Sequence, residues 1–150
     1  MLHDQNNLSK TQIDEFLNAQ RIGTLSLTDG ERAYGIPLAY SYDGESIYLS
    51  ILPKGRKIDY LNKNTNVSFS VFWMPDGTGA QGFGWVSVIL DGQLEHLAEP
   101  GDIAKAVRIA ERKMNLPEGT WDRLIDKAVA NPEKSMFWKL KITSIGARAR

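Results

Sequence analysis

The 150-residue sequence contains no cysteine, and this absence excludes several kinds of chemistry. Disulfide bonds, thiolate catalysis, iron–sulfur clusters and the usual structural zinc sites all require that residue. Because disulfides accumulate in oxidising compartments, we expect a cytoplasmic protein. Internal repeats and linkers are also missing, and the length suffices to bury roughly 70% of the surface of the unfolded chain. Residues 1–150 are therefore predicted to form a single domain.

An excess of charge and a long apolar run are both missing. Lys and Arg together number 18, as do Asp and Glu, so the overall field gives no reason to expect nucleic acid as a partner. No apolar run approaches the roughly 20 residues that span a bilayer, and the amino-terminal segment has no apolar signal core. The sequence predicts a protein that binds neither nucleic acid nor a membrane.

Histidine is scarce, and the two histidines do not form a metal site. His3 lies near the amino terminus, and His96 lies on an expected strand where Glu95 points to the opposite face. No metal site is predicted, and His96 is expected to have a structural or surface role. The sequence shows no recognisable pairing of a nucleophile with a base. Redox chemistry would therefore come from a bound cofactor, which carries the reactive atoms itself.

The apolar pattern predicts a mainly β, α+β domain. Period-two alternation and Asp-Gly turns predict strands over residues Ile22–Thr28, 33–42, 46–52, Asn66–Trp73, 85–97 and 136–145. Helical spacing predicts helices over residues 9–20, 102–114 and 120–130. Six short antiparallel strands with few helices favour a closed or nearly closed barrel, because closure removes exposed sheet edges.

Apolar side chains occur on both faces of the expected strands. In Asn66–Trp73, Val67 and Phe69 lie on one face and Phe72 on the other. The inward face fills the barrel. The outward apolar face is expected to be covered by helices, by a second subunit or by a flat aromatic ligand.

A glycine-rich loop over residues 74–84 contains the spacing G-x-G-x-x-G at Gly77, Gly79 and Gly82. This spacing binds dinucleotides only where it connects a strand to a helix in a parallel unit. Here it precedes a strand in an antiparallel setting. The sequence therefore predicts a hairpin loop and no dinucleotide fingerprint.

The segment 47–63, IYLSILPKGRKIDYLNK, changes from a strand pattern to a helix pattern at a glycine. Lys54, Arg56 and Lys57 cluster where the helix begins. Unpaired N–H groups and the helix dipole favour an anion there. We interpret the segment as a phosphate-binding site, with a solvated basic loop as the alternative.

The order of these motifs resembles the FMN-binding split-barrel proteins related to pyridoxamine 5′-phosphate oxidase, especially their small Nim-like, flavin-reductase branch. The motifs IPLAY, YDGESIYL, GRKIDYL and SVILDG carry the resemblance, which covers about residues 13–110. It implies a six-stranded antiparallel split β-barrel with flanking helices. It also implies a homodimer that holds FMN between its subunits.

The resemblance assigns residues to the phosphate and the ribityl chain of FMN. Arg56 and Lys57 match the phosphate-binding pair of the family, and Lys54 is an optional third cation. Ser50 and Ile51 match positions near the ribityl chain and the phosphate.

The resemblance also assigns residues to the flavin ring. The ring-contacting strand of the family matches four consecutive residues, Ile36, Pro37, Leu38 and Ala39. Pro37 is tolerated there if the side of its backbone that lacks the N–H group faces the ligand rather than a neighbouring strand. Ser87 matches a polar residue close to the isoalloxazine.

The chain departs from the family at two places. Nim-like relatives commonly carry a histidine close to the position of Ser50, so nitroimidazole reduction is not implied. The carboxyl-terminal substrate signature of the true pyridoxamine phosphate oxidases is not apparent in MFWKLKITSIGARAR. Trp85 and Trp138 are expected in the core, with walls of the pocket as the alternative.

The leading hypothesis is an FMN-dependent oxidoreductase that transfers hydride or electrons between NAD(P)H and a small oxidised substrate. The alternative is a non-catalytic protein that stores or senses flavin, heme or deazaflavin F420. Heme would require an axial ligand, for which His96 is the strand candidate.

Overall fold

The structure, a computed structural model, describes residues 7–75 and 84–150. The strands are β1 (Ile22–Thr28), β2 (Ala33–Ala39), β3 (Ser41–Tyr42), β4 (Ser46–Ser50), β5 (Asn66–Trp73), β6 (Val86–His96) and β7 (Phe137–Ala149). The helices are α1 (Lys10–Ala19), α2 (Arg56–Lys63), α3 (Pro100–Lys113) and α4 (Asp122–Ala130), with a 3-10 turn at Pro132–Lys134. None of these helices in the described part of the chain is long and apolar enough to cross a membrane.

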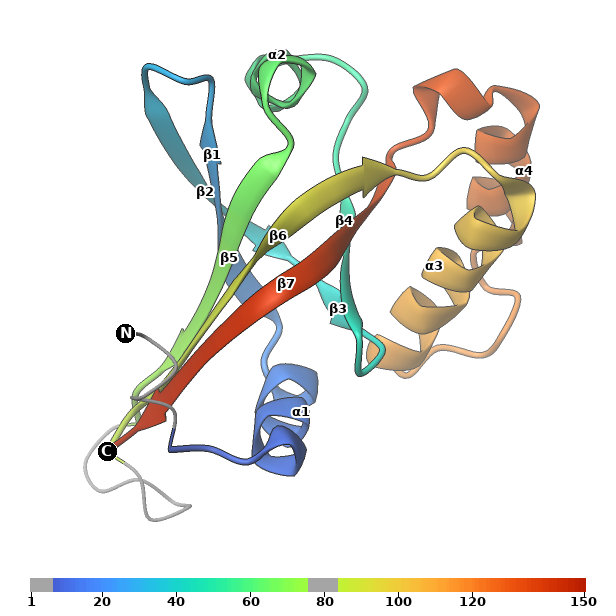
Figure 1. Cartoon of the computed structure of the whole chain (residues 1–150). Coiled ribbons are helices and arrows are strands. Elements are labelled where there is room, and N and C mark those ends of the chain that lie inside the picture. Colours follow the sequence, from blue (N-terminus) through green and yellow to red (C-terminus); the bar gives the residue numbers. More distant parts are fainter. Residues whose placement is uncertain (1–6, 76–83) are drawn as a thin grey trace.

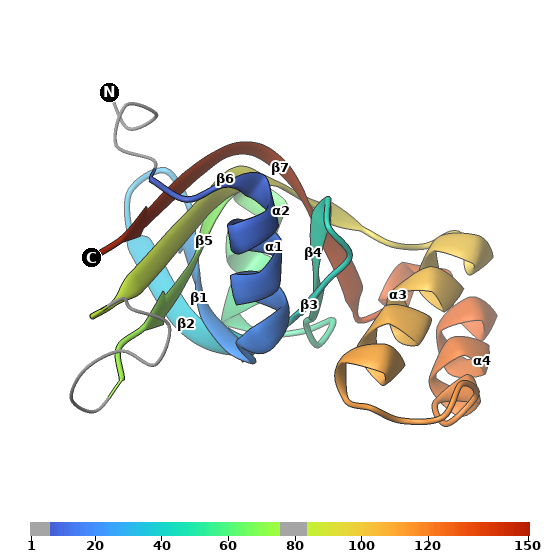
Figure 2. The same ribbon diagram turned by 90° about the horizontal axis from the view of Figure 1, so that it is seen from below.

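All strand pairs are antiparallel, and the sheet order is β2-β1-β5-β6-β7-β4-β3. The sheet curls into a half-barrel, as Figure 1 shows. Helices α1 and α2 lie at opposite ends of this half-barrel, and α3 and α4 pack together beside β3 and β4 (Figures 1 and 2). The mainly antiparallel architecture with flanking helices confirms the fold class that the sequence predicts.

The described residues form seven strands rather than six, because the single strand expected over residues 33–42 is broken at Tyr40. Before the break, Ala39 pairs with β1; after it, Ser41 pairs with β4, at the other end of the sheet order. The Tyr40 hydroxyl donates a hydrogen bond to the carbonyl oxygen of Leu17 at 2.6 Å, which fixes this residue against α1. One residue therefore connects the two ends of the sheet order, and this connection requires the sheet to curl.

The β1–β2 turn and the β3–β4 turn each depend on an aspartate followed by a glycine. The Oδ1 atom of Asp29 accepts from the N–H groups of Glu31 and Arg32 at 2.9 and 2.7 Å, and the glycine after it has a φ of 99°. Asp43 makes the equivalent pair of bonds between β3 and β4, again before a glycine with positive φ. A positive φ is unstrained only for glycine, so the two Asp-Gly sequences determine where the strands reverse.

Helix α1 begins with the capping box that the sequence predicts. Ser9 Oγ accepts from the Gln12 N–H at 3.1 Å, and Gln12 Oε1 accepts from the Ser9 N–H at 2.8 Å. Its buried face carries Ile13 and Leu17, which pack into the barrel core. The amphipathic pattern therefore places α1 against one end of the half-barrel.

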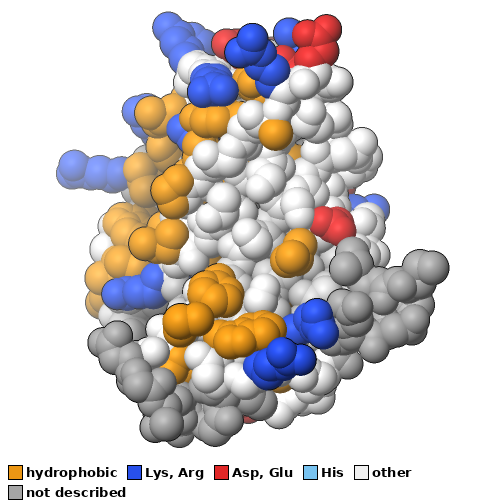
Figure 3. Space-filling model, turned by 90° about the vertical axis from the view of Figure 1, so that its left-hand side faces the viewer, with side chains coloured by type: hydrophobic (Ala, Val, Ile, Leu, Met, Phe, Trp, Pro, Cys, Tyr) orange, Lys and Arg blue, Asp and Glu red, His pale blue; other side chains and the backbone are white. Residues whose placement is uncertain are grey.

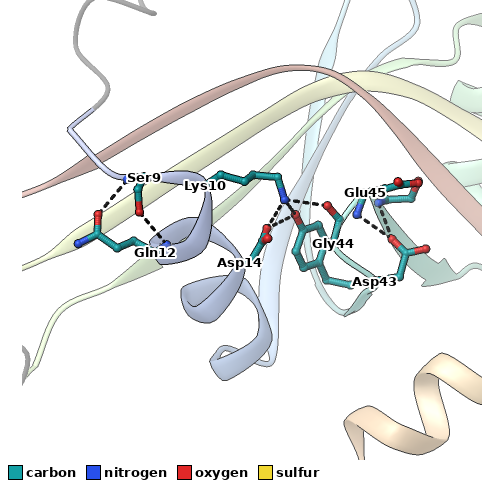
Figure 4. A network of polar contacts seen from close by, with 9 residues as sticks. Ser9, Lys10, Gln12, Asp14, Asp43, Gly44 and Glu45 are labelled. Carbon is teal, nitrogen blue, oxygen red and sulfur yellow. Dashed lines mark hydrogen bonds and ion pairs between the residues drawn. The ribbon is translucent and has the colours of Figure 1, made fainter.

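A polar network attaches α1 to the β3–β4 turn, as Figure 4 shows. Lys10 Nζ donates to Asp14 Oδ1 at 2.5 Å and to the Gly44 carbonyl oxygen at 2.9 Å. The Tyr42 hydroxyl donates to the same Asp14 oxygen at 2.6 Å, and its burial raises the pKa of Tyr42 to about 12. These bonds hold α1 against the β3–β4 turn, next to its apolar face.

The buried side chains form two cores that share β4. Ile47 and Leu49 face the barrel interior, where they join Phe69 and other residues. Tyr48 faces the opposite way and packs with residues of α3 such as Val107. Alternation along β4 thus makes this strand a wall between the barrel and the α3–α4 pair.

Several other boundaries differ from the sequence-based predictions by a few residues, and two of these differences have a clear physical cause. Helix α3 begins at Pro100 rather than Asp102, because proline has no N–H to lose at the first helical position. Strand β7 continues past residue 145 to Ala149, because its last residues pair with the start of β6 at Val86.

Candidate functional site

A cavity of about 650 Å³ lies where β2, β3 and β4 meet α3 and α4. This volume is typical of a small-molecule pocket. Leu38, Ala39 and Ser50 line it, so the structure brings together three of the residues that the sequence assigns to the cofactor. Ser50 continues the face of β4 that carries Tyr48, which explains why it points toward the helices.

Two assigned residues can offer a ligand little besides their main chain. Ile36 and Ile51 are only 8% and 1% exposed and belong to the barrel core. The Ile51 N–H already donates to the Met136 carbonyl oxygen at 2.7 Å. Pro37 is exposed, on the same face of β2 as Ala39.

Strand β2 has one unpaired edge. It is the first strand in the sheet order, so among the described residues no strand pairs with the edge that faces away from β1. Proline is tolerated on such an edge, which accounts for Pro37. The main-chain N–H and C=O groups along this edge are available to a ligand.

The predicted phosphate-binding site lies at the beginning of α2. The helix starts at Arg56 after Gly55, whose φ is 116°, and no side chain caps its first N–H groups. Lys54 and Arg56 are exposed, and Lys57 is half-buried. Within the described residues, none of the three forms an ion pair with a carboxylate, although Asp59 lies in the first turn. The site therefore presents free donors and positive charge.

Arg56 connects this site to β2. Its guanidinium carbon lies 3.9 Å from the centre of the Tyr34 ring and 5.5 Å from that of Tyr60. A hydrogen bond to the Tyr60 side chain raises the pKa of Arg56 above its ordinary value. Tyr34 and Ala39 lie near opposite ends of β2, about 16 Å apart at ~3.3 Å per residue. The cations and the cavity are thus separated by one strand length.

Ser87 lies apart from the other assigned residues. It is on the outer face of β6, where it pairs with Phe72 on one side and Arg148 on the other. In the sheet order β6 is three places from β2. Ser87 does not line the cavity of its own chain.

Trp85, Trp138 and His96 do not line the cavity either. Trp85 lies beside Phe72, with ring centres 6.4 Å apart, and the ring of Trp138 packs 5.0 Å from that of His96. Nε2 of His96 is hydrogen-bonded to the Ser135 carbonyl oxygen at 2.7 Å. His3 and the glycines of the G-x-G-x-x-G spacing lie outside the described residues.

The helical wall of the cavity was not among the residues assigned from the sequence. It includes Ala106 and Ala110 of α3, spaced one helical turn apart, together with Trp121 and Leu124. Both alanines lie in the helix that the sequence predicts over residues 102–114. Their small side chains leave space, which is the one sequence signal for a cavity at this position.

Glu111 holds Trp121 at this wall. Its side chain is 1% exposed, and it accepts from the N–H of Trp121 at 2.7 Å, the N–H of Gly119 at 3.3 Å and Arg108 Nη1 at 2.9 Å. Burial alone would raise the pKa of Glu111, but these donors outweigh it and the pKa lies below its ordinary value. An ionised carboxylate therefore organises the α3–α4 connection.

The sequence profile of the family described as pyridoxamine 5′-phosphate oxidase matches residues 9–149. The chain belongs to this family. Among curated protein sequences, none matches the chain.

Solved structures support the family's fold. A proposed 5-nitroimidazole antibiotic resistance protein from Bacteroides thetaiotaomicron is 20% identical, with a TM-score of 0.77 over 93% of this chain and 82% of that one. A FAD-binding protein from Mesorhizobium loti is 25% identical, with a TM-score of 0.63 over 95% and 93% of the two chains. The flavocytochrome Anf3 from Azotobacter vinelandii is 19% identical, with a TM-score of 0.68 over 95% and 67%. This pyridoxamine 5′-phosphate oxidase family member thus shares its fold with flavoproteins.

Proposed function

We propose that this protein binds FMN, with the phosphate at the beginning of α2 and the ring along β2 at the mouth of the cavity. The contact between Arg56 and Tyr34 carries this proposal, because it places the cations at one end of β2 while the cavity lies at the other. Membership in the family and similarity to a FAD-binding protein support a flavin.

The residues present fit the chemistry of FMN. A phosphate dianion matches Arg56, Lys57 and the uncapped N–H groups of α2. The edge of a flavin ring carries donors and acceptors that match the unpaired edge of β2. Leu38 and Ala39 supply an apolar surface beside that edge. Both ends of the cofactor therefore have complementary groups in one chain.

A bound flavin supplies hydride and electron transfer, which no side chain of this protein supplies. The chain's own residues bind and orient the cofactor, and the α3–α4 wall excludes water from its ring. We propose that the protein is an oxidoreductase, with NAD(P)H as the donor and a small oxidised molecule as the acceptor.

We also propose a homodimer, because the outer face of the sheet carries large apolar side chains that are exposed in one chain. Ile22, Phe72 and Ile89 are 61%, 59% and 45% exposed there. Figure 3 looks onto the side where β1, β2 and β5 lie, and most of the centre of that face carries no charged side chain. A second copy of the chain is proposed to cover it.

Ser87 fits this arrangement. It is paired with Phe72, so it lies on the proposed dimer face and not at the cavity of its own chain. Its assigned contact with the ring would then be made to the FMN of the other subunit. The proposal thereby accounts for the separation of Ser87 from the other assigned residues.

A heme-binding function is less well supported. His96, the candidate axial ligand, is hydrogen-bonded to the Ser135 carbonyl oxygen and packed on Trp138. A flavin carrier without catalysis remains the second candidate, because no catalytic side chain has been assigned.

Titration of the flavin-free protein with FMN, followed by flavin fluorescence, tests the proposal. We expect saturation at one FMN per chain, weaker binding of FAD, and a dimer by light scattering. A Soret band in the purified protein, or tighter binding of FAD than of FMN, would contradict the assignment. Oxidation of NAD(P)H by the loaded protein distinguishes an enzyme from a carrier.

A further inference from the structure

The cavity extends beyond the part assigned to FMN. Leu38, Ala39 and Ser50 supply the strand side, but most of its wall comes from α3, α4 and the segments around them. Ala106, Ala110, Met114, Leu124, Met136 and Phe137 make this remaining wall almost entirely apolar. The space is therefore suited to an apolar molecule beside the proposed ring position.

The charged groups that line the cavity are all positive. Among the described residues, the lining includes Arg21 and Lys113 and no carboxylate. A cationic ligand would be repelled there, and a neutral one would leave the positive charge uncompensated. Charge complementarity thus favours an anion.

The ammonium group of Lys113 is already hydrogen-bonded within the protein. Its ammonium group donates to the carbonyl oxygens of Leu17 at 3.3 Å, Asn18 at 2.8 Å and Gln20, all at the end of α1. An ammonium group has three N–H donors, so these contacts use all of them. Lys113 therefore contributes charge to the cavity but no free donor.

Most N–H donors of the Arg21 guanidinium group have no hydrogen-bond acceptor among the described residues. Within the described residues, its one hydrogen bond from the side chain is Nη2 to Met114 Sδ at 3.7 Å, and a thioether is a weak acceptor. A guanidinium group has five N–H donors in a planar fork that fits a carboxylate. The main chain of Arg21 is fixed by a bond from the Tyr40 N–H to its carbonyl oxygen at 3.3 Å. The side chain thus starts from a fixed position at the cavity.

We propose that this cavity binds the second reactant of the enzyme, a small apolar molecule whose carboxylate pairs with Arg21. The proposal rests on the proposed FMN site, because it takes the cavity as the space that the ring leaves free. It names a substrate class, apolar carboxylates, and assigns Arg21 as the residue that selects for it.

The electrostatics of the cavity agree with this proposal. Burial lowers the pKa of Lys113, and the neighbouring charge of Arg21 lowers it further. Both residues lie at the end of α1 next to Met114, and two neighbouring cations are both stabilised when an anion binds beside them.

The test compares two probes of equal shape, 2-naphthoate and 2-naphthamide, by calorimetric titration of the FMN-saturated protein. Because a hydrogen bond to a charged group contributes about 1.5–3 kcal/mol, naphthoate should bind at least about tenfold more tightly. Arg21→Gln should reduce this ratio to about one, and Arg21→Lys should preserve part of it. Arg123→Gln, at an exposed position of α4 outside the cavity, is the matched control and should leave the ratio unchanged.

A second variant tests the location without changing any charge. Ala110→Phe fills the cavity from α3, so both probes should bind at least about tenfold more weakly while circular dichroism shows a folded protein. Unchanged binding in this variant would overturn the proposal. So would equal affinities of the two probes for the unaltered protein, or a naphthoate preference that persists in Arg21→Gln.

Repeating the titrations without FMN separates this proposal from the previous one. If naphthoate binds only the flavin-free protein, FMN itself occupies the cavity and the inference fails while the flavin site stands. If FMN does not bind but the Arg21-dependent preference is present, the proposed cofactor is wrong and the carboxylate site is supported.

Discussion

The guanidinium group of Arg56 stacks on the ring of Tyr34, with its central carbon 3.9 Å from the ring centre. This contact joins the first residue of α2 to β2, two elements that contribute opposite ends of the proposed cofactor site. A cation held over an aromatic ring loses less freedom when a phosphate binds. The contact therefore preorganises the site.

Replacing Tyr34 by Leu should weaken FMN binding. A cation–π contact at an exposed site contributes roughly 0.5–1 kcal/mol, so the dissociation constant should rise by about two- to fivefold. Tyr34→Phe keeps the ring and should bind FMN as the unaltered protein does. Equal affinities of the Leu and Phe variants, measured by flavin fluorescence, would show that the stacking has no role.

Replacing Phe72 by Glu should dissociate the proposed dimer. Phe72 is 59% exposed on the outer face of β5, and a carboxylate buried at a subunit interface without a partner is strongly unfavourable. Light scattering should report a monomer at micromolar concentration. Val129→Glu introduces the same charge on α4, where the side chain is 38% exposed, and should not change the mass. A Phe72→Glu protein that stays dimeric would exclude this face as the interface.

Much of the fold was predictable because its strands carry strong local signals. The bounds of Ile22–Thr28 and Asn66–Trp73 are those that alternation predicts, and both Asp-Gly turns are present. The break at Tyr40 was not predictable, because residues 33–42 keep one uninterrupted β pattern. It arises from the contact of Tyr40 with Leu17 and from pairing with two distant strands.

The candidate site likewise contains residues that were predictable from the sequence and residues that were not. Arg56 and Lys57 lie in a contiguous segment, and the beginning of a helix there was predictable from Gly55. Arg21 and Trp121 were not assigned, because only tertiary packing brings them to the cavity from opposite parts of the chain. A wall of ordinary apolar residues has no sequence signature of its own.

Replacing Gly92 by Ala should strongly destabilise the protein. Gly92 lies at the β6–β7 register shift, and a Cβ atom there would overlap the carbonyl oxygen of Lys141. We expect a loss of about 3 kcal/mol or more in the free energy of unfolding measured in urea. At Gly146 on the neighbouring strand a Cβ atom meets nothing within 4 Å, so Gly146→Ala should change stability by less than about 0.5 kcal/mol. Similar losses in the two variants would refute this account of the bulge.

The contribution of Glu111 to stability should depend on pH. Its folded-state pKa lies below the ordinary value of 4.5, so its ionised form stabilises the fold at pH values above 4.5. This stabilisation is lost as the pH falls through the lower folded-state pKa. The thermal midpoint of Glu111→Gln should therefore lie well below that of the unaltered protein at pH 7, with the difference shrinking at acidic pH.

The exposed Glu118 in the same connection provides the control for that experiment. The thermal midpoint of Glu118→Gln should equal that of the unaltered protein at every pH. A deficit in Glu111→Gln that is constant between neutral and acidic pH would mean that its cause is packing and not the charge of Glu111.

The most direct test of the account compares FMN with riboflavin, which lacks the phosphate. Each charge-assisted contact from Arg56 and Lys57 should contribute roughly 1.5–3 kcal/mol, so the unaltered protein should bind FMN at least about a hundredfold more tightly than riboflavin. In the double variant Arg56→Ala, Lys57→Ala this ratio should approach one while the affinity for riboflavin stays the same. A ratio that is unchanged in the double variant would contradict the assignment of the phosphate to the beginning of α2.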